Sequence, residues 1–136
     1  MTGRILPVPD DASAPFWEAC ADHLLKLPRC AQCNQLTLPP EIVCPHCKTT
    51  KPAWRYDTVS GRGKVRTWTV MRHSFLGGFE LPFVLVDVEL EDQMDLRMVG
   101  RLLGETEAPL AIGERVEVVF EELVPGVAIP SFRRAG

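Results

Sequence analysis

The chain has 136 residues, of which 46% are hydrophobic and 24% are charged, so we expect a soluble protein with one or two small cores. Its 15 Lys+Arg and 18 Asp+Glu give a net charge of -3, which excludes a strongly basic protein that is drawn generally to nucleic-acid phosphates. The longest apolar run, 83–86, is too short to span a bilayer, and residues 1–10 lack the pattern of a secretory signal. We therefore expect a cytoplasmic protein with no membrane span.

An apolar stripe at helical spacing runs through residues 14–27, and Ser13 with Pro15 is typical of a helix start. The stripe contains Phe16, Ala19, Cys20, His23, Leu24 and Leu27. A catalytic thiol needs a base and access, and His23 lies three residues after Cys20. A cysteine on an apolar helix face is more often a small packed or interface side chain, and we favour that interpretation.

Four of the five cysteines form two Cys-x-x-Cys pairs, Cys30 with Cys33 and Cys44 with Cys47, separated by ten residues. Two such pairs can place four thiolates around one Zn²⁺, whereas disulfides are unusual in a reducing cytoplasm. Four protein ligands leave no open position for water or substrate, so we expect one structural zinc rather than a catalytic one. His46 lies inside the second pair and is expected on the surface.

The segment that contains these cysteines is too small to bury a core of its own. A ribbon of about 25 residues needs another source of folding free energy. Binding of structural zinc can supply on the order of 10 kcal/mol. We therefore expect the ribbon to unfold without its metal.

From Trp54 onward the apolar spacing changes from helical to alternating, which predicts β-strands. We expect five strands, at 64–72, 82–90, 96–102, 115–123 and 127–132. Glu117 and Glu121 are expected to face outward. The core-facing residues are expected to be Val65, Thr67, Thr69, Met71, Val84, Val86, Val88, Leu90, Leu96, Met98, Leu102, Val116, Val118 and Phe120.

Five short strands in about 80 residues can avoid exposed edges by closing into a small barrel, and the OB-fold is the common five-stranded solution. An SH3-like barrel has a similar strand number and stays open as an alternative at this point. We predict a mainly β protein with three parts. These are an N-terminal extension and helix (1–27), a rubredoxin-like zinc ribbon with four cysteine ligands (28–56) and a five-stranded OB-fold barrel (57–136).

Two further sequence patterns resemble a catalytic or phosphate-binding site. Acidic residues cluster around one predicted hairpin, and paired carboxylates can act as acid and base; they are Asp87, Glu89, Glu91, Asp92 and Asp95. Because Asp87 and Glu89 alternate with valines, a solvated strand face is the better interpretation. The 61–64 segment, Gly-Arg-Gly-Lys, indicates a turn rather than a phosphate-binding loop, because no helix pattern follows it.

The loop from Arg72 to Phe79 combines aromatic residues with a diglycine between two predicted strands. Phe75 and Phe79 either close one end of the barrel or make a hydrophobic contact with a partner or ligand. Arg72 and His73 are candidates to meet a phosphate group. The sequence leaves these alternatives open.

The order of motifs along the chain resembles one family, the acyl-CoA-associated OB-fold and rubredoxin-like zinc-ribbon proteins known as domain of unknown function 35. The resemblance extends from about Ala14 to Arg134, although the family's glycine is missing from residues 23–27. The matching features are Phe16-Trp17, the two cysteine pairs, Trp54, Gly61-Arg62-Gly63-Lys64-Val65, Pro82-Phe83, Ile112-Gly113 before Val116, and Phe132-Arg133.

The resemblance implies an accessory subunit without catalytic residues, which binds and stabilises a thiolase-fold enzyme acting on acyl-CoA. Such enzymes include thiolases and aldolases that shorten steroid side chains, sometimes joined by a hot-dog-fold hydratase. The helix has large apolar groups beside a ribbon too small to bury them, so we expect the partner at Phe16, Trp17 and Cys20. Phe75 and Phe79 are expected to form a second contact, with the partner or with an acyl chain. Arg72 and His73 are expected to meet the phosphates of coenzyme A.

A nucleic-acid-binding protein is the alternative from another functional class, because OB-folds and zinc ribbons both occur in such proteins. The composition disfavours it. The chain has six Phe, three Trp and one Tyr, and its basic strand residues are offset by acids elsewhere.

Overall fold

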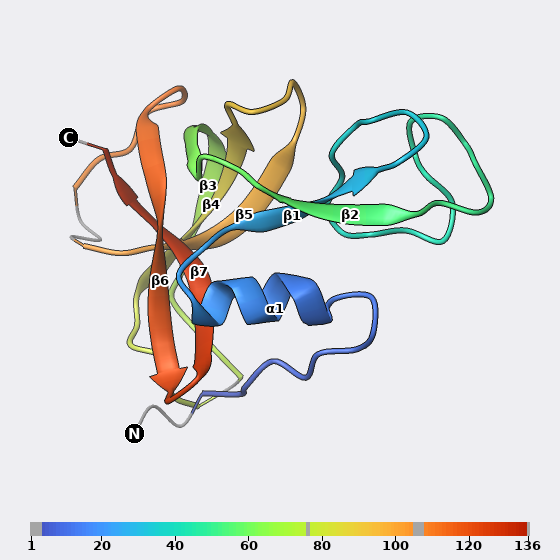
Figure 1. Cartoon of the computed structure of the whole chain (residues 1–136). Helices are drawn as coiled ribbons and strands as arrows, with labels where there is room; N and C mark the ends of the chain where they lie inside the picture. Colours follow the sequence, from blue (N-terminus) through green and yellow to red (C-terminus); the bar gives the residue numbers. More distant parts are fainter. Residues whose placement is uncertain (1–3, 76, 105–107, 136) are drawn as a thin grey trace.

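The computed structural model describes residues 4–75, 77–104 and 108–135. A short helix, a two-stranded sheet with long loops, and a barrel follow one another along the chain (Figure 1). The loops that carry the four paired cysteines extend away from the barrel, and the helix lies beside the last strand. Within the described residues, no helix is long and apolar enough to cross a membrane.

Helix α1 spans Ala14–Ala21, and its first turn is preceded by a reciprocal pair of hydrogen bonds. The Ser13 N–H donates to Asp10 Oδ1 at 2.8 Å, and the Asp10 N–H donates to Ser13 Oγ at 3.1 Å. The helix is shorter than the predicted 14–27, because His23 adopts a left-handed conformation with φ of 59° and turns the chain. Leu27, which was expected on the helix, is instead buried in a strand.

Strands β1 (Lys26–Cys30) and β2 (Trp54–Thr58) form an antiparallel pair in which Pro28 lies opposite Tyr56. The pair brings the two ends of the cysteine-containing segment together, because Cys30 ends β1 opposite Trp54, the first residue of β2. The chain between Cys30 and Trp54 therefore forms one long loop that leaves the two-stranded sheet and returns to it.

The second part of the chain is a closed five-stranded barrel, as predicted, and its strand order is β3-β4-β5-β7-β6. A parallel bridge between Leu102 and Phe132 closes it, and the other pairings are antiparallel. The strands are β3 (Arg62–Met71), β4 (Phe83–Leu90), β5 (Arg97–Leu102), β6 (Arg115–Val124) and β7 (Val127–Arg134).

The predicted inward face of β3 is wrong beyond its first half. A register shift between Val65 and Thr67 breaks the simple alternation, so Thr67 and Thr69 are exposed. Trp68 and Val70 lie opposite the buried Val86 and Val84; Val70 is half-buried, whereas Trp68 remains 36% exposed. The extra residue of a β-bulge exchanges the two faces of a strand, and alternation alone does not reveal where it falls.

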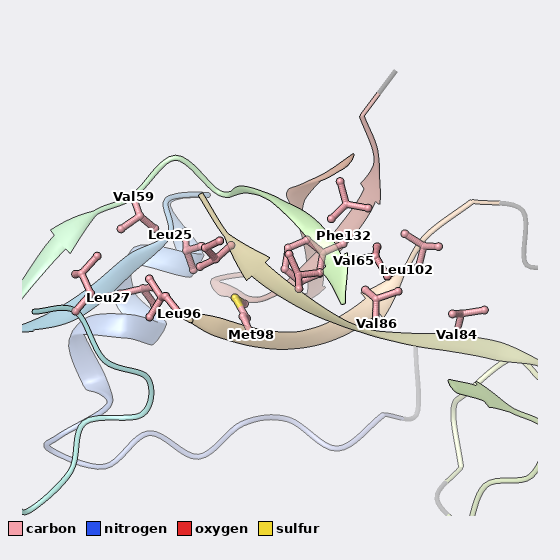
Figure 2. Packing of buried hydrophobic residues seen from close by; sticks show 14 residues of the cluster. Leu25, Leu27, Val59, Val65, Val84, Val86, Leu96, Met98, Leu102 and Phe132 are labelled. Atoms are coloured by element: carbon pink, nitrogen blue, oxygen red, sulfur yellow. The ribbon is translucent and has the colours of Figure 1, made fainter. Parts of the chain in front are cut away.

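One hydrophobic cluster extends from the two-stranded sheet into the barrel (Figure 2). Leu25, Leu27 and Leu36 from the N-terminal part share it with strand residues of the barrel, so the two parts do not have separate cores. The barrel residues in the cluster are Val65, Val84, Val86, Val88, Leu90, Leu96, Met98, Leu102, Val116 and Phe132, and the connecting residue is Val59.

Candidate metal centre and partner surface

The two cysteine pairs are built on the same backbone turn. The Asn34 N–H donates to the Cys30 carbonyl at 2.7 Å, and the Lys48 N–H donates to the Cys44 carbonyl at 2.9 Å. Asn34 and Lys48 both have φ of 66°. A left-handed residue at this position turns the chain back, so that both cysteines of each pair lie near one point.

The four sulfurs converge on one point. Sγ of Cys30 lies 3.9 Å from Sγ of Cys47, Sγ of Cys33 lies 3.7 Å from Sγ of Cys44, and all four lie within 4.8 Å of one another. In a tetrahedral site with bonds of about 2.3 Å from metal to sulfur, neighbouring sulfurs are about 3.8 Å apart. The donor set and its spacing therefore fit a closed tetrahedral metal site.

Protonation differs among these thiols. Burial raises the pKa of Cys44, but the N–H groups of Cys47 and His46 and the neighbouring sulfurs outweigh it and bring the pKa to about 6. The Gln35 N–H lowers the pKa of Cys33, but burial and the neighbouring sulfurs outweigh that effect and raise it to about 11. The metal-free cluster therefore holds thiolate and thiol together, and a bound cation must displace the remaining protons.

His46 is exposed, as predicted, and is not one of the four grouped ligands. Its Nε2 lies 3.1 Å from the carbonyl oxygen of Leu36, a buried residue of the loop between the two cysteine pairs. The imidazole therefore connects the second pair to that loop.

Trp17 is half-buried and meets Phe16 edge-to-face, with 4.9 Å between ring centroids. It lines three separate surface hollows of about 330, 160 and 520 Å³. Phe16 shares two of these hollows and also packs against the hydrophobic cluster. Both residues therefore reach the surface where an apolar hollow is available.

Cys20, the third residue expected at this surface, is fully buried. Burial raises the pKa of its thiol to about 11, so it is a packed thiol rather than a nucleophile. The His23 ring points elsewhere, because it stacks on Phe120 and lies 3.2 Å from Glu122 Oε1. The arrangement supports packing and gives no Cys–His catalytic pair.

The loop between β3 and β4 separates its two phenylalanines. Phe75 is fully exposed, whereas Phe79 stacks on Phe83 with 5.1 Å between centroids and has the Arg4 guanidinium 4.9 Å from its ring. Arg72 and His73 are exposed at the start of the same loop. Phe79 therefore has the packing role and Phe75 offers the free aromatic surface.

The acidic residues of the β4–β5 hairpin are held by basic neighbours. Arg97 Nε donates to Asp87 at 2.9 Å, and Arg66 donates to Glu89 at 2.8 Å. The Asp95 N–H, followed by Arg66, lowers the pKa of Glu89 below its usual range. Both carboxylates are therefore held in ion pairs with arginine, and Glu89 is stabilised as an anion, which does not suit a general acid.

Two family models match consecutive parts of the chain. Residues 17–53 match the ChsH2 rubredoxin-like zinc ribbon domain, and residues 56–121 match the ChsH2 C-terminal OB-fold domain. A solved structure described as "Ltp2-ChsH2(DUF35) aldolase" matches with a TM-score of 0.81 and 32% identity, covering 94% of this chain and 98% of that one. The chain belongs to the ChsH2, or DUF35, family. The barrel is therefore an OB-fold, and the SH3-like alternative is set aside.

Two curated relatives have names that describe roles. A DUF35 domain-containing scaffold protein of Methanothermobacter thermautotrophicus is 27% identical over 70% of each chain. The 3-oxo-4,17-pregnadiene-20-carboxyl-CoA hydratase alpha subunit of Mycobacterium tuberculosis is 33% identical over 79% of this chain. The chain spans only 33% of that hydratase subunit, so the match is to the ChsH2-like part of a longer protein.

Proposed function

We propose that this chain is a non-catalytic accessory subunit that binds and stabilises a thiolase-fold enzyme acting on acyl-CoA. The observation that carries the proposal is the match over 98% of a ChsH2 chain from an aldolase that also contains Ltp2. The scaffold name of the archaeal relative supports the same role. The chemistry then belongs to the partner, and this subunit supplies a folded surface.

We infer that the metal is one structural Zn²⁺, held by Cys30, Cys33, Cys44 and Cys47. The zinc-ribbon match and the sulfur separations support this assignment. Four thiolates fill a tetrahedral site, so the metal would hold the ribbon loops together and would offer no position to substrate.

We place the main partner contact at Trp17 and Phe16, and a second contact at the loop of Phe75 and Phe79. The three hollows beside Trp17 and the full exposure of Phe75 support these positions, because large apolar groups left at a surface commonly mark an interface. Cys20 is left out because it is buried.

The substrate class is proposed to be a steroid acyl-CoA ester. The name of the hydratase alpha subunit, which includes a pregnadiene-carboxyl-CoA, supports this class and also a hydratase as a further partner. A hot-dog fold for that hydratase is what the family resemblance implies. Arg72 and His73 are exposed beside Phe75 and are proposed to meet coenzyme A phosphates. The nucleic-acid alternative is less favoured, because Arg66, one of the basic strand residues it would use, already pairs with Glu89.

Co-purification from native cells tests the proposal. A thiolase-fold enzyme should be identified by mass spectrometry, and its activity or solubility should fall when this chain is omitted. The purified chain alone should not cleave or hydrate acyl-CoA esters. Retention on single-stranded DNA without any thiolase-fold partner would contradict the proposal.

A further inference from the structure

The chain's N-terminal part and its last strand build one surface around Trp17. We define the Trp17 surface as Pro7, Pro9, Trp17, Leu38 and Ile129. Pro7 and Pro9 line the 330 Å³ hollow with Trp17, whereas Leu38 and Ile129 line the 520 Å³ hollow with it. Trp17 borders both depressions, so its apolar ring has open space beside it in each.

The charges along this surface have one sign. Residues 5–22 contain four carboxylates and no Lys or Arg; they are Asp10, Asp11, Glu18 and Asp22. Glu18 lines the first hollow, and Asp11, Glu18 and Asp22 are all exposed. Hydrogen bonds from Ser13 lower the pKa of Asp10, so it too is anionic.

These four carboxylates differ from the acids of the barrel. Within the described residues, no ion pair involves any of them. In the barrel, by contrast, Asp87 pairs with Arg97, Glu89 with Arg66, Glu117 with Arg133 and Glu121 with Arg4. Arg97 lines the 520 Å³ hollow, but its charge is already offset by Asp87. Glu18 therefore gives the Trp17 surface a negative charge that no ion pair offsets within the described residues, and Asp10, Asp11 and Asp22 add to it from the same segment of the chain.

We propose that the Trp17 surface receives a basic segment of the partner protein, with an apolar side chain seated beside Trp17 and Lys or Arg residues facing the four carboxylates. The proposal rests on the proposed function, because it describes how that partner is recognised. A second copy of this chain would bring the same negative charge against itself. Coenzyme A phosphates, nucleic acid and anionic lipid would be repelled in the same way.

A photo-crosslinker at Ala21, which lines the 330 Å³ hollow, identifies the occupant directly. The full chain with p-benzoylphenylalanine at this position is irradiated in native cells, and the crosslinked peptide is sequenced. A peptide of net positive charge supports the inference, and a neutral or acidic peptide overturns it. A basic peptide from a protein without a thiolase fold would overturn the proposed function and keep this inference. Formation of the complex without a crosslink at position 21 would overturn the inference alone, and the absence of any complex would overturn both.

Charge reversal gives a second, quantitative test with the isolated partner. Glu18→Lys should weaken binding about fivefold at low salt, and the difference from the unsubstituted chain should shrink as salt is raised. The matched control is Glu91→Lys, which makes the same change in net charge at an exposed residue that pairs with Arg62. The control should change affinity less than about twofold. Equal losses in both variants, or no loss in Glu18→Lys, would overturn the inference.

Discussion

The side-chain amide of Gln93 forms two hydrogen bonds with the backbone of Leu36. Its Nε2 donates to the Leu36 carbonyl and its Oε1 accepts the Leu36 N–H, both at 2.8 Å. Gln93 lies in the turn between β4 and β5, and Leu36 lies between the two cysteine pairs. The barrel and the metal-binding loop are therefore joined by a polar contact as well as by the shared hydrophobic cluster.

Replacing Gln93 should destabilise the protein. Gln93→Ala leaves the N–H and carbonyl of the buried Leu36 without this partner, which should lower the free energy of unfolding by about 1–3 kcal/mol. Denaturant unfolding of the zinc-loaded chain measures this loss of unfolding free energy. Met94→Ala is the control, because Met94 is 84% exposed in the same turn. Equal stability of the two variants would contradict a structural role for the amide.

Metal content should depend on the four paired cysteines and not on Cys20. A Cys30→Ser/Cys44→Ser double variant should lose stoichiometric zinc, because each cysteine pair then keeps a single thiolate. Cys20→Ser should keep one zinc per chain, although burial of a hydroxyl lowers its stability. Elemental analysis of the purified variants measures the zinc bound per chain. Full zinc in the double variant, or loss of zinc from Cys20→Ser, would refute the ligand assignment.

Zinc affinity should increase with pH. In the metal-free site Cys33 has a pKa of about 11, so it is protonated near neutral pH and must release its proton on binding. Cys44, with a pKa of about 6, is already largely ionised near neutral pH. Its proton therefore adds to the pH dependence of zinc affinity mainly below pH 6. Affinity should therefore rise about tenfold per pH unit for each proton released, as measured by chelator competition at pH 7 and pH 8. Affinity independent of pH would contradict the protonation state described above.

Truncation of Trp17 should separate binding from folding. Trp17→Ala should weaken binding of the partner by about 30-fold, equivalent to about 2 kcal/mol, while zinc content and β-type circular dichroism stay unchanged. Phe16→Ala is the comparison, because Phe16 packs against the hydrophobic cluster and its loss should lower stability. If Trp17→Ala unfolds the isolated chain and shows no separate binding defect, Trp17 belongs to the core.

Two glycines with similar backbone angles should respond differently to alanine. Gly61 has φ of 76°, and a Cβ there would lie 2.3 Å from Val118 Cγ1. Gly126 has φ of 82°, with nothing within 4 Å of such a Cβ. Gly61→Ala should cost about 3 kcal/mol of unfolding free energy and Gly126→Ala about 1 kcal/mol. Similar losses of unfolding free energy would show that backbone strain alone sets the cost of alanine at both sites.

The sequence was most informative where the signal is local. The cysteine spacing predicted four sulfurs that the structure brings together, and alternation located the five barrel strands. Prediction from the sequence failed where the local structure depends on distant residues or on one backbone angle. The helix ends at Ala21 through the left-handed His23, and β3 changes face at its bulge. Nothing in the pattern around Gln93 indicates its contact with Leu36, since the two are 57 positions apart. The division at residues 27 and 56 stays a prediction.

The packing of α1 against β7 has a consequence for when the Trp17 surface exists. Pro7, Pro9 and Trp17 are synthesised more than a hundred residues before Gly126, Val127 and Ala128, which complete their hollow. The bridge from Leu102 to Phe132 that closes the barrel also waits for the last strand. A chain in which β7 has not yet been made or has not folded therefore cannot display the finished surface, so a partner that recognises this surface binds only subunits in which β7 is already in place.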